Sequence, residues 1–254
     1  MTNRLLAAFV FFTRLPFWRI REVPAECFKH VVNYWPLAGW LTGGIMSITL
    51  WVTAQILPLS VAVLLAILAR LLLTGCLHED GLADFIDGFG GGTTRERTLA
   101  IMKDSQIGSY GVIGLIIYFS LMWSLLSALP LTLACIVILA GDPWSKFCAA
   151  QQINFLPYAR KEEESKAKVV YNRMSPGAFI LALISGILPA VVFLPSAAFG
   201  LAGVMPLATS AILILLMKKR LQGYTGDCCG AVFLLSELTF YIGINIVYQN
   251  YYIN

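Results

Sequence analysis

Three aspartates in the first half of the chain have a type and spacing that could do chemistry. Asp80, Asp84 and Asp87 are spaced i, i+4 and i+7, which places them on one face of a helix. Carboxylates held together repel one another unless a cation or protons compensate them, and oxygen-only ligands favour a hard divalent ion, above all Mg²⁺. The alternative is an aspartate-rich helix end lying in water. Because the three share one face at the mouth of an apolar segment, we favour a metal site.

The residues flanking these aspartates could contribute to the same site. Asp104 could serve as a fourth carboxylate, and Lys103 beside it could contact a phosphate. The glycine-rich residues 88–94 match neither a Walker nor a dinucleotide-binding motif, so a flexible loop is the simpler interpretation. His78 could exchange a proton, or it could be an ordinary interfacial histidine.

A second group of polar residues lies in the last third of the chain. Residues 223–227 end at Asp227, and Glu237 follows ten residues later, about 15 Å further along a helix. A carboxylate placed so deep in a membrane is costly unless it has a partner. Earlier in the chain, Asp142 and Lys146 are spaced i, i+4 and could form an ion pair with a structural or a functional role.

The composition indicates what must surround these polar residues. Of the 254 residues 58% are hydrophobic and 13% are charged, and the mean hydropathy is +0.76. A soluble domain usually has about 25% charged residues, so the apolar surface must meet lipid. We therefore predict an all-α, polytopic membrane bundle that forms one domain over residues 1–254. A net charge of only +4 excludes a typical nucleic-acid binder, and cysteines without C-x-x-C spacing indicate neither zinc nor disulfides.

About seven apolar segments are long enough to cross a bilayer, since a spanning helix needs about 20 apolar residues. They lie near residues 34–57, 59–77, 107–128, 131–150, 177–195, 200–217 and 228–248. Three breaks at Pro58, Pro130 and Pro195 carry no charge and predict turns between antiparallel helices.

Charged residues concentrate on the other side of these spans. They lie in the segments 1–33, 78–106, 158–173 and 218–220. By the positive-inside rule these segments face the cytoplasm, which predicts an N-terminus inside and a C-terminus outside. We expect residues 1–33 to form an interfacial segment on the inner leaflet.

Two motifs resemble those of a known family. One runs from His78 to Asp84 as His-Glu-Asp-Gly-Leu-Ala-Asp and continues at 101–105 as Ile-Met-Lys-Asp-Ser; the other is Gly-Tyr-Thr-Gly-Asp at 223–227. With shorter matches along the chain, they resemble the cobalamin synthase family, the adenosylcobinamide-GDP ribazoletransferases. Phe85 stands where we expect a threonine, and Lys146 stands where an arginine is more usual, but neither change removes a proposed metal ligand.

This resemblance implies an enzyme of the final steps of cobalamin (vitamin B12) nucleotide-loop assembly in the bacterial inner membrane. It implies that adenosylcobinamide-GDP reacts with α-ribazole or α-ribazole 5′-phosphate and releases GMP, with Mg²⁺ required. Such a phosphoryl transfer depends on positioning and on cations that neutralise developing charge. We expect an active site that faces the cytoplasm, lipid around the helices, and a homo-oligomer or a complex with other enzymes of cobalamin assembly.

The resemblance and the chemistry together give a set of expected site residues. The carboxylates assigned to one or two Mg²⁺ ions are Asp80, Asp84, Asp87 and Asp104. The residues assigned to phosphate or substrate contact are Arg97, Lys103, Ser105, Arg160 and Thr225. His78 and Asp227 are the alternatives for the proton acceptor, and Lys146 and Glu237 are expected to support the site from within the membrane.

Two other functions use similar residues. An ion-coupled transporter also places carboxylates in a membrane, but here the acidic cluster lies at one membrane edge and the far-side turns are short and uncharged. A CDP-alcohol phosphotransferase also uses aspartates, but its D-x-x-D-G-x-x-A-R pattern is not found in this sequence.

Overall fold

The computed structural model describes residues 2–160 and 169–250, which are mostly helical. In chain order the helices are α1 (Thr2–Phe12), η1 (Phe17–Arg19), η2 (Ala25–Tyr34), α2 (Trp35–Thr53), α3 (Leu59–Thr74), α4 (Leu77–Gly91), α5 (Arg95–Lys103), α6 (Ser109–Ser127), α7 (Leu131–Ala150), α8 (Gln152–Phe155), α9 (Pro176–Phe193), η4 (Ala197–Gly203), α10 (Val204–Arg220) and α11 (Gly226–Tyr248). These described residues form no strand, which confirms the all-α prediction. Residues 161–168, part of the charged segment predicted at 158–173, lie outside the described residues.

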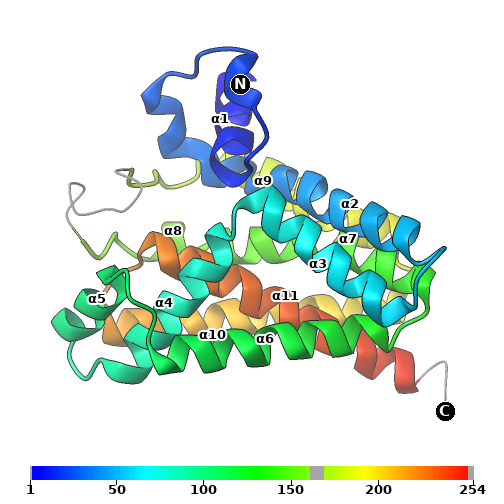
Figure 1. Ribbon diagram of the computed structural model, residues 1–254. Helices are drawn as coiled ribbons and strands as arrows, with labels where there is room; N and C mark the ends of the chain where they lie inside the picture. The colour runs from blue at the N-terminus through cyan, green and yellow to red at the C-terminus, as the bar shows by residue number, and fades with distance from the viewer. Residues whose placement is uncertain (1, 161–168, 251–254) are drawn as a thin grey trace.

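Helices α7 and α11 form the buried centre of the bundle, and α6, α9 and α10 lie outside it (Figure 1). In the most apolar part of each helix, 83% of α7 with α8 and 72% of α11 is buried, against 22% for each outer helix. The side chains that the outer helices expose include large apolar ones such as Ile116, Val191 and Leu215. Because a surface of this kind is unfavourable in water, these helices face lipid.

Five helical segments are long and apolar enough to cross a membrane. They are Ser109–Ser127, Leu131–Phe155, Pro176–Phe193, Ala197–Arg220 and Gly226–Tyr248, and the pair α3 with α4 adds a sixth if it counts as one span with a 92° bend. The three predicted breaks are confirmed, since Pro58 precedes α3, Pro130 precedes α7 and Pro195 separates α9 from η4. Helix α2 covers the expected span at 34–57 but is not among the five, so seven spans stay a prediction.

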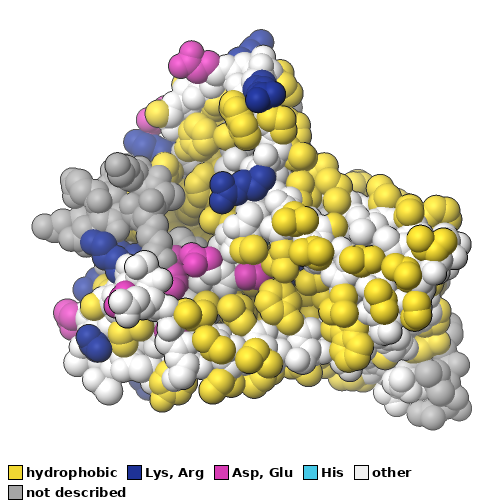
Figure 2. Space-filling view, in the orientation of Figure 1, with side chains coloured by type: hydrophobic (Ala, Val, Ile, Leu, Met, Phe, Trp, Pro, Cys, Tyr) yellow, Lys and Arg dark blue, Asp and Glu magenta, His cyan; other side chains and the backbone are white. Residues whose placement is uncertain are grey.

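The two ends of the bundle differ in chemistry. The turn between α2 and α3, the turn between α6 and α7 and the end of α11 lie together on one side, and α5, α8 and the start of α11 lie on the other (Figure 1). Charged side chains gather at this second side and around α1, while apolar side chains cover most of the remaining visible face (Figure 2). This asymmetry is the one that the sequence predicts, although the side of the membrane on which each end lies stays a prediction.

A sharp break between α3 and α4 redirects the aspartate-bearing helix. Gly75 and Cys76 adopt left-handed backbone conformations, with φ of 65° and 58°. A Cβ at Gly75 would lie 2.2 Å from Nε of Arg14, so a larger residue here would adopt a strained conformation and displace the Arg14 side chain. After the break, α4 carries all three aspartates of the predicted helical face.

Candidate functional site

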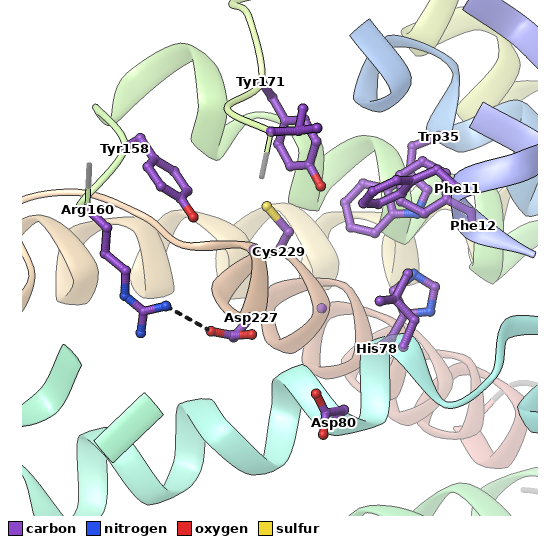
Figure 3. A pocket seen from close by; sticks show the side chains of 14 residues that line it. Phe11, Phe12, Trp35, His78, Asp80, Tyr158, Arg160, Tyr171, Asp227 and Cys229 are labelled. Atoms are coloured by element: carbon purple, nitrogen blue, oxygen red, sulfur yellow. Dashed lines mark ion pairs between the residues drawn. The ribbon is translucent and has the colours of Figure 1, made fainter. Parts of the chain in front are cut away.

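A cavity of about 300 Å³ opens where α4 crosses α11, and it collects charged residues from three separate segments. Asp80 comes from α4, Asp227 from the first turn of α11, and Arg160 from the segment that follows α8. In Figure 3 Asp227 lies between the other two, with Arg160 pointing toward it. The cavity therefore brings together residues from both motifs of the sequence analysis.

Two glycines allow α4 and α11 to approach closely enough to form this site. A Cβ added at Gly81 would lie 2.9 Å from the carbonyl oxygen of Asp227, and one at Gly230 would lie 2.9 Å from that of His78. Contacts this short would force the two helices apart. The glycine that follows Asp80 in the sequence thus sets the distance between the two halves of the site.

Main-chain hydrogen bonds position the cationic side of the cavity. Tyr158 and Tyr224 form a short parallel bridge, in which the N–H of Ala159 donates to the carbonyl of Tyr224 at 2.8 Å. This bridge fixes Arg160 next to the start of α11. Nη1 of Arg160 lies 4.0 Å from Oδ2 of Asp227, and the two side chains are only 4% and 9% exposed.

The opposite side of the cavity is aromatic. The rings of Phe12 and Trp35 stack with centroids 5.2 Å apart, and the His78 ring lies nearly parallel to Trp35 at 5.7 Å. His78 is buried, and its Nε2 has no hydrogen-bond partner among the residues that the structure describes. Phe11 and Tyr171 complete this side, and burial raises the pKa of the Tyr171 hydroxyl well above its ordinary value.

The four carboxylates assigned to Mg²⁺ do not line one common cavity. Asp80 lines the main cavity and Asp84 is half-buried further along α4. Asp87 accepts the backbone N–H groups of Gly108 at 2.7 Å and Gly111 at 2.8 Å, so it holds the start of α6. Asp87 and Asp104 line a second cavity of about 340 Å³.

The residues present suit a Mg²⁺ ion shared with the substrate and not one held by protein ligands alone. Within residues 2–160 and 169–250, no three Asp, Glu, His or Cys side chains gather in a geometry that would hold an ion. However, Mg²⁺ is commonly bound by one or two carboxylates together with substrate phosphates and water. Asp80 and Asp227, in one cavity with Arg160, fit that shared mode, so the ion would depend on the substrate for its remaining ligands.

The other residues assigned to substrate contact lie in different surroundings. Arg97 is exposed beside the second cavity, and Lys103 is exposed in a shallow hollow that it shares with Arg160. Ser105 is exposed in the turn before α6. Thr225 is buried, and its Oγ1 accepts the N–H of Cys228 at 3.3 Å as the N-cap of α11, so its hydroxyl holds the helix that carries Asp227.

The predicted ion pair between Asp142 and Lys146 is confirmed, and both side chains are fully buried. Nζ of Lys146 also donates to the hydroxyl of Thr42 at 2.6 Å, and that hydroxyl donates to Oδ2 of Asp142 at 2.9 Å. Lys146 lies 4.6 Å from the centre of the Phe233 ring, which in turn contacts His78. The pair thus supports the aromatic side of the cavity indirectly, because Lys146 contacts Phe233 and Phe233 contacts His78.

Glu237 has a partner that the sequence analysis did not identify. Both of its carboxylate oxygens accept a hydrogen bond from Nη1 of Arg70 at 2.7 Å, and the hydroxyl of Tyr241 donates to Oε1 at 2.9 Å. Nη2 of Arg70 donates to the hydroxyl of Tyr118 at 3.0 Å and lies 3.9 Å from Oε1 of Glu79. Arg70 is the single charge in the apolar segment 59–77, and that isolation was a signal that it needed a buried partner.

Comparison with known proteins gives one consistent family. The sequence model of the family described as cobalamin-5-phosphate synthase matches residues 4–245. A relative from Shewanella sp. (strain W3-18-1), named adenosylcobinamide-GDP ribazoletransferase, is 38% identical over 245 residues, which cover 95% of this chain and 93% of the relative. The protein of the same name from Shewanella oneidensis is 37% identical over 240 residues, covering 93% of this chain and 91% of that protein. No solved structure gave a significant match.

The family match spans both sides of the cavity, from α1 through the aspartate helix to α11. The similarity extends over nearly the whole length of these relatives, so it is not confined to the apolar spans. This chain belongs to the cobalamin-5-phosphate synthase family.

Proposed function

We propose that this protein joins adenosylcobinamide-GDP to α-ribazole or α-ribazole 5′-phosphate and releases GMP at the cavity between α4 and α11. The observation that carries the proposal is the meeting of Asp80, Asp227 and Arg160 in that cavity. Two carboxylates and a guanidinium are the groups that hold a diphosphate and its cation. The names of the relatives contain adenosylcobinamide-GDP and a ribazole, which supports the proposal.

In this proposal Arg160 binds the diphosphate of the activated corrinoid. Its side chain is nearly buried and held at Nη2 by the carbonyl of Leu99 at 2.9 Å, so it is already oriented before substrate enters. Asp80 faces the same space from α4. Asp80 and Asp227 would hold Mg²⁺ together with the substrate, and the ion would supply positive charge that offsets the charge developing on the phosphate oxygens.

The reaction transfers one phosphoryl group. The ribose 3′-hydroxyl oxygen of the ribazole forms a bond to the phosphorus that carries the cobinamide, and the bond from that phosphorus to GMP breaks. The hydroxyl proton passes to a carboxylate or an imidazole, for which Asp227 and His78 are the candidates. Nε2 of His78 is enclosed among aromatic rings, whereas Asp227 lies at the charged end of the cavity, so Asp227 is the candidate if Asp80 alone holds the ion.

We further propose that the cavity faces the cytoplasm in the bacterial inner membrane. The charged segments that border it include the basic end of α10, with Lys218, Lys219 and Arg220, and the positive-inside rule places such segments inside. Both substrates are polar and would reach the cavity from that side. Nothing in this arrangement requires a path across the bilayer, which separates the proposal from a transporter.

The proposal is tested with the purified full chain in lipid vesicles. GMP release is measured with adenosylcobinamide-GDP and α-ribazole, with and without Mg²⁺, and CDP-activated alcohols are supplied in a parallel assay. We expect Mg²⁺-dependent GMP release only with the corrinoid and ribazole together. Release of CMP from a CDP-alcohol, or ion-coupled uptake without product, would contradict the proposal.

A further inference from the structure

The main cavity has two chemically different ends. Arg160 and Asp227 lie at one end, while Phe11, Phe12 and Trp35 lie at the other above His78 (Figure 3). Phosphates and a cation account for the charged end. The aromatic end remains to be explained by another part of a substrate.

The rings at the aromatic end form a floor and a wall. Phe12, Trp35 and His78 stack nearly parallel to one another, with interplanar angles of 11° to 25°, and together they form a closed floor. Phe11 stands edge-on to Tyr171 at 6.1 Å and lines the cavity from the N-terminal helix α1. Phe11 and Tyr171 are each partly exposed, so they keep surface that can contact a ligand.

Among the described residues, few polar side-chain atoms lie at this end. The side chains that line it offer the imidazole of His78 and the hydroxyl of Tyr171. Burial raises the pKa of Tyr171, so its hydroxyl stays protonated and can donate a hydrogen bond. A ring bound here must therefore need few hydrogen bonds, because a buried polar group without a partner is costly.

This criterion distinguishes among the flat rings of the two substrates. Guanine and adenine both carry several donors and acceptors on their edges, and binding them here would leave most of these unpaired. Ribazole is a benzimidazole riboside, and its base has a single free ring nitrogen, which acts only as an acceptor. One donor from the wall satisfies that base, and its apolar faces suit stacking on aromatic side chains.

We propose that the aromatic end of the cavity binds the benzimidazole base of the ribazole acceptor. This inference rests on the proposed function, and it adds a place for the nucleophile within the site. The base contacts Phe11 and Tyr171, and the attached ribose extends toward Asp227 and the phosphates. The N-terminal helix is then part of the acceptor site in addition to its place at the surface.

The test compares the two substrates in a Phe11→Ala variant. We expect the KM for α-ribazole to rise about tenfold, while the KM for adenosylcobinamide-GDP changes less than twofold, because loss of one stacking partner weakens base binding to about this extent. Phe9→Ala is the matched control, since Phe9 lies on the same helix but packs on Phe17 outside the cavity. The control should leave both KM values within twofold of wild type.

A second measurement separates a direct contact from a loosened fold. Wild type should prefer α-ribazole over imidazole riboside, which lacks the fused ring, and Phe11→Ala should reduce that preference several-fold. Phe11→Leu, which keeps apolar volume without an aromatic face, should give an intermediate value. An unchanged preference, or an equal rise in both KM values, would overturn the inference.

Direct binding keeps the two proposals distinguishable. Calorimetric titration of α-ribazole into wild type and Phe11→Ala measures the subsite without turnover. If wild type releases no GMP but binds α-ribazole about tenfold more tightly than the variant, the proposed function fails and the subsite stands. If GMP is released and the two affinities are equal, the subsite fails and the function stands.

Discussion

The buried pair Arg70–Glu237 and the cavity pair Arg160–Asp227 use the same two functional groups in different ways. Nη1 of Arg70 contacts both oxygens of Glu237 at 2.7 Å, and two tyrosine hydroxyls join the pair. Arg160 and Asp227 lie 4.0 Å apart beside an open cavity. The first pair is enclosed within the protein, whereas the second lines an open cavity. Enclosure therefore distinguishes the buried pair from the pair that we propose takes part in catalysis.

The carboxylates on α4 show the same contrast within one helix. Asp87 is committed to the backbone N–H groups that open α6, and Asp80, two turns earlier, lines the cavity. Both belong to one predicted helical face, yet they serve different partners. Spacing placed the aspartates on one face, and the neighbouring helices decide which of them lines the cavity.

The sharpest test of the catalytic side is Asp80→Asn. This change keeps the shape of the side chain but removes a charge from the proposed Mg²⁺ and phosphate site. We expect kcat to fall about 10³-fold, with a thermal unfolding midpoint close to that of wild type. GMP release over a Mg²⁺ titration and thermal unfolding in detergent check the two halves of the prediction.

Asp87→Asn is the matched comparison, because it alters the same residue type on the same helix. Here we expect a lower unfolding temperature, since the hydrogen bonds to Gly108 and Gly111 lose their charged acceptor. If Asp80→Asn unfolded early while Asp87→Asn lost activity without loss of stability, the assignment of the two aspartates would be reversed.

The structural pair is tested by Arg70→Met. Removing one member of a buried ion pair leaves Glu237 buried and uncompensated, which typically costs about 3–5 kcal/mol of unfolding free energy. We expect this loss in denaturant unfolding of the purified protein in micelles. The double variant Arg70→Met, Glu237→Leu removes both charges and should recover most of the stability.

GMP release by the double variant would sharpen the comparison further, because stability and activity can then be compared in one protein. Glu79, beside His78 and Asp80, lies 3.9 Å from Arg70, so the network also borders the start of the aspartate helix. If the double variant stayed as unstable as Arg70→Met alone, the pair would not be the closed structural unit described above.

The crossing of α4 and α11 is tested by Gly81→Ala. The added Cβ would meet the Asp227 backbone at 2.9 Å, and overpacking of this kind costs about 1–3 kcal/mol. Because the shift moves Asp80 away from Asp227, we expect activity to fall by more than the loss of stability explains. Gly177→Ala, where a Cβ meets no atom within 4 Å, is the control and should leave activity unchanged.

Much of this architecture follows from the sequence because lipid imposes simple rules. Apolar length and proline breaks predicted the helices and turns, and three aspartates at helical spacing predicted α4. The pairing of Arg70 with Glu237 was not predicted, because 167 residues separate them and only packing brings them together. The aromatic end was missed for the same reason, since Phe11, Trp35 and Tyr171 look like ordinary membrane residues until the fold gathers them. Which aspartate meets substrate likewise depends on the neighbouring helix and not on spacing.

The smallest expected effect concerns Thr225, which the sequence analysis assigned to substrate contact. In the structure its hydroxyl caps α11 by accepting the N–H of Cys228 at 3.3 Å and donates to Oδ2 of Asp227 at 3.4 Å, and Thr225 itself is buried and does not line the cavity. Loss of such a cap costs about 1 kcal/mol, so Thr225→Ala should lower the unfolding free energy by that amount while the KM for each substrate stays within twofold. Thr225→Ser retains the capping oxygen and should behave as wild type in both measurements. A tenfold rise in KM with unchanged stability would instead place the hydroxyl against substrate, and the division between capping and binding residues at the start of α11 would have to be redrawn.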